Sequence, residues 1–141
     1  MKKEIKTIKQ SSESKAKRYT ANTARIFLAL IYFVFGFGYF LMPEPDMSMF
    51  PPKAVAFMAG LAATGYFFPF LKIVEGICGF MLFFKRWTPL SLLILAPITI
   101  NILLYGIFID RSGLPMHIPM VASSIYLMWY NFDKYAPIFK A

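Results

Sequence analysis

The sequence predicts an all-α integral membrane protein, a four-helix bundle with one short additional helix between its first and second membrane spans. Three observations lead to this prediction. The chain of 141 residues is 58% hydrophobic and only 16% charged, whereas soluble domains are about a quarter charged. Four apolar runs are about long enough to cross a bilayer. The basic residues fall mainly on one side of the membrane when these runs are threaded through it.

The four apolar runs are the predicted membrane spans, because an α-helix needs about 20 apolar residues to cross the hydrocarbon core. They cover residues 26–42, residues 66–84, residues 87–109, and a stretch that begins at residue 114 or 117 and ends at residue 132. In the first span, Gly36 and Gly38 allow a neighbouring helix to approach closely. In the third span, Pro97 frees a backbone carbonyl, so we expect a kink there.

A short apolar helix is predicted between the first two spans. A proline-rich turn at residues 43–52 precedes it, and the apolar residues 53–63 are too few to cross the bilayer alone. We expect this helix to lie in the membrane interface or to re-enter the membrane part of the way, ending at Gly65.

The N-terminal residues differ in character from the rest of the chain. Residues 1–22 are rich in Lys and Ser without an apolar period, which predicts a basic, disordered cytoplasmic tail before a membrane domain at residues 23–141. A basic stretch before an apolar run is also typical of a signal peptide. However, the apolar run here exceeds the usual length of about 7–15 residues, and no small-residue cleavage site follows it. An uncleaved first span is the better interpretation.

The distribution of basic residues predicts the orientation. With the N-terminus inside, twelve of the fifteen Lys and Arg residues lie in the cytoplasm, including residues 85–86, Lys134 and Lys140. Lys53 and Arg111 lie outside, so both termini are expected on the cytoplasmic side of the membrane. The net charge of +8 is therefore assigned to the surface of the lipid bilayer. Nucleic acid is not expected as a partner, because the tail has one aromatic residue and no folded motif.

Lys72 and Glu75 are the most informative residues, because they lie inside an otherwise uncharged apolar run. A charge at the centre of a bilayer costs roughly 2.5–3.5 kcal/mol on insertion scales, so such residues are internally paired and often functional. At a spacing of three they share a helix face. Glu75 is the candidate catalytic residue, as a proton acceptor or a hydrogen-bond acceptor for a ligand. Lys72 either contacts that ligand or extends to the interface, and a purely structural ion pair remains the alternative.

Further candidates lie on the second and third spans. Asn101 and Tyr105 are candidate ligand-binding residues, and with Pro97 they recur every four residues and so share one helix face. We expect the Asn101 amide to find a hydrogen-bond partner in Glu75 on the neighbouring helix. Such an interhelical hydrogen bond that only holds the helices together is the alternative to a ligand contact. Gly76 and Gly79 are expected to have a structural role, allowing another helix to pack close to Glu75. Their spacing is a weak signal for a homo-oligomer.

The remaining composition excludes several kinds of site. A single cysteine, Cys78, excludes an intramolecular disulfide, and a single histidine, His117, excludes bis-histidine haem ligation within one chain. No motif for a metal, a phosphate, a dinucleotide or a nucleophilic triad is present. We expect no cofactor that is held covalently or by metal ligation. Any redox chemistry then requires a diffusible carrier such as a quinone, or a partner redox protein.

Residues 24–138 resemble the DoxX-like family, which consists of small four-helix bacterial membrane proteins. Three runs carry the resemblance: the apolar run at residues 25–36, the run from Thr-Gly-Tyr to Lys-x-x-Glu at residues 64–75, and Ala-Pro-x-x-x-Asn at residues 96–101. The family takes its name from a membrane subunit of a thiosulfate:quinone oxidoreductase. The resemblance places Lys72, Glu75, Pro97 and Asn101 at the family's polar positions within the membrane.

The functional hypothesis is a quinone-interacting membrane subunit of an oxidoreductase system. Glu75 would exchange the proton, while Lys72, Asn101 and Tyr105 would contact the quinone. Any enzymatic role would be that of a subunit. The alternative is a non-catalytic membrane anchor or scaffold in which the Lys72–Glu75 pair is structural. A small transporter is a third hypothesis, although no internal repeat is visible in the sequence.

Overall fold

The computed structural model describes residues 1–139, which form helices and turns without a strand. The all-α class predicted from the sequence is therefore confirmed for these residues. Lys140, which was counted among the cytoplasmic charges, lies outside the described residues. The helices are α1 (Lys2–Gly38), α2 (Pro52–Ala62), α3 (Phe67–Leu82), α4 (Thr88–Phe108), α5 (Leu114–Tyr130) and α6 (Phe132–Tyr135), and the 3-10 turns are η1 (Met47–Met49), η2 (Arg111–Gly113) and η3 (Ala136–Phe139).

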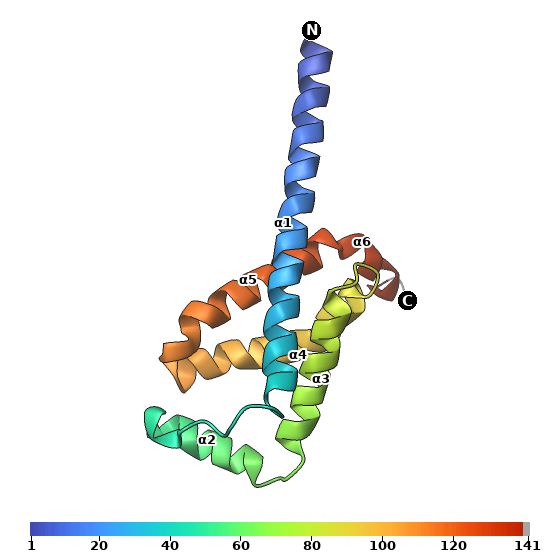
Figure 1. Ribbon diagram of the computed structural model, residues 1–141. Coiled ribbons are helices and arrows are strands. Elements are labelled where there is room, and N and C mark those ends of the chain that lie inside the picture. The colour runs from blue at the N-terminus through green and yellow to red at the C-terminus, as the bar shows by residue number, and fades with distance from the viewer. Residues whose placement is uncertain (140–141) are drawn as a thin grey trace.

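The prediction of a disordered tail is not what the structure contains. Helix α1 is continuous over 37 residues, and its N-terminal half projects beyond the other helices (Figure 1). The sequence has no Gly or Pro from residue 2 to residue 35, and its Lys, Glu, Gln and Ala residues have good helix propensity. Once the packed C-terminal half is helical, each further residue adds a hydrogen bond without a new nucleation step.

Fewer candidate spans are present than the four that were predicted. Helices α1 and α4 are each long and apolar enough to cross a membrane, and α2 with α3 adds a third span if that bent pair is counted as one. The pair is bent by 93° near Gly65, whose φ of 74° lies in a region that only glycine adopts readily. The predicted short helix is present as α2, which has 11 residues. Helix α5, with 17 residues, and α3, with 16, are each shorter than the roughly 20 residues of a typical span.

The four longer helices pack around one core. Helix α1 packs against α3, α3 against α4, α4 against α5, and α5 returns to α1. In Figure 1, α4 and α5 run across the direction of α1 and α3, and α2 lies at the end of the molecule away from the N-terminus. The core residues are Ala21, Leu28, Ala29, Tyr32, Cys78, Leu82, Leu92, Leu95, Met120 and Leu127. Many large apolar side chains on the opposite helix faces are exposed, which is the pattern of helices surrounded by lipid.

Candidate functional site

The two charged residues of α3 form an ion pair. The Lys72 Nζ donates a hydrogen bond to Glu75 Oε2 at 2.7 Å, across one turn of the helix. Glu75 is only 3% exposed, whereas the side chain of Lys72 is 22% exposed. The carboxylate is thus enclosed within the protein, behind a lysine whose side chain still reaches the surface.

The ion pair lies at a very close contact between α1 and α3, and glycines make this contact possible. A Cβ on Gly36 would collide with the backbone of Gly76, and a Cβ on Gly79 would collide with the α1 backbone at Phe33. The absence of these side chains lets the two helix backbones meet directly. Glu75 is therefore held in an interface that cannot widen without loss of packing.

A buried hydrogen-bond chain lies beside the pair and joins α1 to α4. The Tyr32 and Thr99 hydroxyls are hydrogen-bonded to each other, and the Thr99 hydroxyl donates to the Leu95 carbonyl at 2.8 Å. Because Thr99 has one hydroxyl proton, Tyr32 is the donor in the first bond. Tyr32 is 1% exposed, and its backbone lies against Gly79, one helical turn after Glu75 on α3. Sequence reasoning missed Tyr32 and Thr99, although Tyr32 lies one helical turn before Gly36.

Asn101 does not join this group. Asn101 and Pro97 share a face of α4, as predicted, but this face is exposed. Thr99 is buried, and residues two apart on a helix point in nearly opposite directions, so a helix that buries Thr99 turns Asn101 outward. The expected pairing of Asn101 with Glu75 is therefore wrong. The role of Asn101 as a ligand contact stays a prediction. Helix α4 itself continues through Pro97.

Tyr105 lies near the C-terminal end of α4. Its ring packs against Phe57 of α2, with 5.6 Å between the ring centroids. Its hydroxyl is buried and has no hydrogen-bond partner among the described residues. Its backbone carbonyl accepts hydrogen bonds from the amides of Ile109 and Asp110, which close the helix. Tyr105 is thus associated with α2 and with the turn that leads into α5.

This turn contains a second polar cluster, which was not among the candidate sites predicted from the sequence. The His117 ring packs against Gly106 and Gly113, and its Nδ1 is buried without a partner in residues 1–139. Asp110 Oδ1 accepts hydrogen bonds from the Ser112 hydroxyl at 2.7 Å and the Ser112 amide at 3.0 Å. These bonds hold the pKa of Asp110 below its ordinary value.

Arg25 is a buried residue whose role sequence reasoning missed, because it was counted with the basic tail. It is 9% exposed, and its Nη1 donates hydrogen bonds of 2.6 Å to the carbonyls of Leu82 and Phe83. These carbonyls lie at the C-terminal end of α3, where backbone acceptors lack partners within the helix and the helix dipole is negative. The sequence offers one signal for this role, namely the position of Arg25 directly before the first apolar run.

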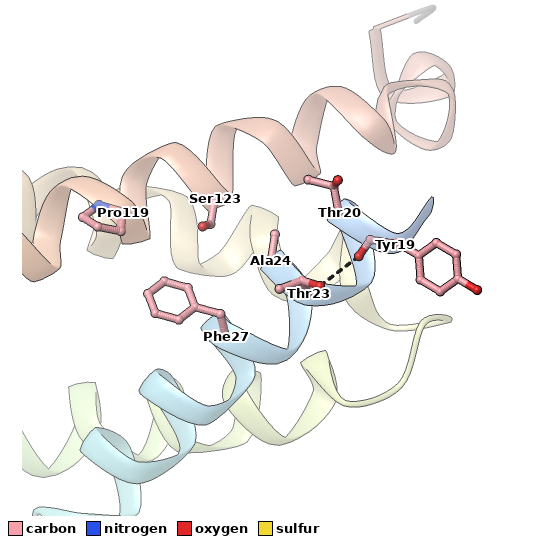
Figure 2. Close-up of a pocket in the computed structure, with 7 residues that line it drawn as sticks. All are labelled: Tyr19, Thr20, Thr23, Ala24, Phe27, Pro119 and Ser123. Carbon is pink, nitrogen blue, oxygen red and sulfur yellow. Dashed lines mark hydrogen bonds between the residues drawn. The ribbon is translucent and has the colours of Figure 1, made fainter. Parts of the chain in front are cut away.

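An open groove of about 540 Å³ runs between α1 and α5. Figure 2 shows Phe27 of α1 facing Pro119 and Ser123 of α5 across it, while the Thr23 hydroxyl donates back to the Tyr19 carbonyl of its own helix. The groove contains no charged side chain. It is an apolar feature of the outer surface and does not reach the Lys72–Glu75 pair.

Within residues 1–139, no three His, Cys, Asp or Glu side chains gather closely enough to hold a metal ion. Cys78 is a free, buried thiol in the core. No protein-family model, curated protein or solved structure matches this chain.

Proposed function

We propose that this protein is a multi-pass protein of a bacterial inner membrane, with both termini in the cytoplasm, and a member of the DoxX-like family. The length and apolar character of α1 and α4 support the membrane location. The orientation is supported by the gathering of cations from α1, the α3–α4 turn and α6 around one pocket, as expected for segments on the same side of a membrane.

Within that membrane, the proposed function is a quinone-interacting subunit of an oxidoreductase system. The observation that carries this proposal is the Lys72–Glu75 pair, an enclosed carboxylate behind a partly exposed lysine in an otherwise apolar helix. A lipophilic quinone that approached from the bilayer would meet the Lys72 ammonium, which can donate to a quinone carbonyl oxygen. Glu75 behind it, once it has taken up a proton from water, can pass that proton to the oxygen as the quinone is reduced. A partner redox protein would supply the electrons that reduce the quinone.

The first experiment compares the wild-type protein with Glu75→Gln after gentle purification, with bound quinone measured by mass spectrometry of the extracted lipids. We expect stoichiometric quinone in the wild type and little in the variant. Glu44→Gln is the matched control, because it removes the same charge from an exposed position and should leave the quinone content unchanged. Equal quinone in all three samples, or none in any, would contradict the proposal.

The non-catalytic anchor is retained as a second candidate because of one specific observation. Gly36 and Gly76 bring α1 directly against α3 beside the ion pair, so the pair can serve simply to lock two helices together. The double variant Lys72→Gln/Glu75→Gln separates the two candidates. A structural pair predicts that the double variant is more stable than either single variant, because no unpaired charge remains buried, and that partner binding persists. A ligand site predicts loss of quinone in the double variant whatever its stability.

A further inference from the structure

A basic pocket lies at the end of the helical assembly where α1, the α3–α4 turn and the C-terminal segment meet. Four cations line it: Arg18, Arg25, Lys85 and Lys134. No carboxylate is among its lining residues, and Asp133, next to Lys134 in the chain, is exposed outside it. Among the described residues the single ion pair is that of Lys72 and Glu75, so these four cations are left without an acidic partner.

The polar groups of the pocket are arranged as donors. The Nη1 of Arg25 is occupied by the end of α3, but its Nε is buried and has no hydrogen-bond partner in residues 1–139. The Lys134 Nζ donates to Asn131 Oδ1 at 3.0 Å, which holds its ammonium at the rim. The side chains of Asn22 and Thr88 also line the pocket. Arg25 is about nine-tenths buried as a residue and lies among three other cations without an acidic partner, and such a cluster of positive charge favours an anionic ligand.

The size of the pocket restricts what that anion can be. Its volume is about 220 Å³, below the roughly 300–1,000 Å³ of pockets that enclose drug-sized ligands. A phosphate group with a short substituent fits this description better than a whole nucleotide. Tyr130 also lines the pocket, and Tyr is typical of the level at which lipid headgroups lie. Basic pockets between membrane helices on the cytoplasmic side bind such headgroups.

We propose that this pocket is a binding site for a phosphate group, carried either by the headgroup of an anionic lipid or by a free phosphate. Arg25 lines the pocket while its Nη1 holds the end of α3, and Arg18, Lys85 and Lys134 are the side chains that we expect to donate to the phosphate oxygens. The inference is independent of the quinone proposal, because the pocket shares no residue with the Lys72–Glu75 pair.

The test uses the full chain in a mild neutral detergent and measures binding by isothermal titration calorimetry. The probes are dioctanoyl phosphatidic acid, dioctanoylglycerol, which lacks the phosphate, and inorganic phosphate. The pocket variant is Arg18→Gln/Lys85→Gln/Lys134→Gln. The control, Lys9→Gln/Lys15→Gln/Arg86→Gln, loses the same charge from exposed residues that do not line the pocket.

We expect phosphatidic acid to bind the wild type and the control, and to bind at least about tenfold more weakly to the pocket variant. Inability of inorganic phosphate to compete would identify a lipid as the source, whereas competition at a similar concentration would identify a free phosphate. Equal weakening in both triple variants would mean diffuse charge attraction and would overturn the site. Binding of dioctanoylglycerol as tight as that of phosphatidic acid would overturn it too.

A single variant keeps the proposal testable if the triple variant does not fold. Lys85 is exposed in the turn between α3 and α4, so Lys85→Gln should fold, and we expect it to weaken phosphatidic acid binding by a factor of about two to three, consistent with loss of one exposed charge contact. Arg86→Gln, its neighbour, should leave the affinity unchanged. Identical affinities for the two single variants would contradict the proposal.

Discussion

At the scale of single residues, Arg25 shows how a charge can be structural within an apolar assembly. It bonds to Leu82 at the end of α3, which is 57 residues later in the chain. There, one guanidinium nitrogen satisfies two backbone carbonyls. Unsatisfied carbonyls at a buried helix end are costly, and a cation there also interacts favourably with the helix dipole. The same side chain also lines the basic pocket, so it connects the packing of α3 with the proposed phosphate site.

Replacement of Arg25 by Met should therefore destabilise the fold. The variant leaves the Leu82 and Phe83 carbonyls without their donor, and hydrogen bonds to a charged group contribute about 1.5–3 kcal/mol. We expect a loss of that size in the free energy of unfolding, measured by denaturant titration in detergent micelles. Arg18→Met is the control, because Arg18 is exposed and makes no comparable contact. Equal losses in the two variants would show that Arg25 acts only through its general charge.

At the scale of elements, the contact between α1 and α3 positions the candidate site. Without a strong hydrophobic force between helices in lipid, close backbone contact is a main source of their association. Gly36 of α1 and Gly79 of α3 supply that contact on either side of the turn that carries Glu75. The Tyr32–Thr99 hydrogen bond then attaches α4 to the same region of α1. The ion pair is thus held at the contact between α1 and α3, and α4 is bonded to α1 one helical turn before Gly36.

A glycine series tests this contact. Gly36→Ala and Gly79→Ala each place a Cβ against the backbone of the facing helix, and we expect each to lower the free energy of unfolding by about 1–3 kcal/mol. Gly60→Ala is the matched control in α2, because a Cβ there meets nothing within 4 Å, and Ala in a helix is favoured over Gly by roughly 0.5–1 kcal/mol. Unfolding in detergent should therefore rank Gly60→Ala at or above the wild type. The same rank for all three variants would refute the close contact.

The turn between α4 and α5 should make stability depend on pH. The Ser112 hydroxyl and amide stabilise the Asp110 carboxylate, so the pKa of Asp110 is lower in the folded state than in the unfolded chain. The resulting stabilisation is fully present above the unfolded pKa of about 3.9 and is lost as the pH falls through the folded pKa. The wild type should exceed Asp110→Ala in stability at about pH 5. Unfolding curves at decreasing pH should show this difference shrinking, and a difference that grows on acidification would contradict the assignment.

The elements themselves were largely predictable, whereas the directions in which they face were not. The lengths of the apolar runs and the prolines between them placed α2 to α5 within a few residues, because run length and helix breakers act locally. The burial of Thr99 instead of Asn101 depends on how α4 is rotated against α1, and a uniformly apolar helix carries little periodic signal for that rotation. The helix at residues 2–22 was missed because polarity was taken as a sign of disorder, although nothing in the segment interrupts a helix.

At the scale of the whole molecule, the two ends differ in charge. One end carries the basic pocket of Arg18, Arg25, Lys85 and Lys134. The turn at the far end of α4 and α5 carries the buried carboxylate of Asp110. The cations therefore gather at the end with the pocket, whereas Asp110 at the other end is followed directly by Arg111. Helices α3 and α5 are shorter than the roughly 20 residues of a typical span. Whether they cross the membrane is therefore decided by finding which turns lie on the same side of it.

Single-cysteine labelling distinguishes two, three and four crossings. Cys78 is the only cysteine and is buried, so Cys78→Ser provides the background for Ser48→Cys, Arg86→Cys, Arg111→Cys and Asp133→Cys. With an impermeant maleimide, four crossings predict that positions 86 and 133 react only in inside-out vesicles, and positions 48 and 111 only in right-side-out vesicles.

Three crossings that end with α4 would move position 133 to the outer side, because α5 would not return the chain. Two crossings by α1 and α4 would place position 86 outside and positions 111 and 133 inside. We expect the four-crossing pattern, in which the basic pocket opens to the cytoplasmic leaflet. Labelling of position 86 from outside would refute this orientation of the pocket, and labelling of positions 48 and 86 from the same side would refute α3 as a span.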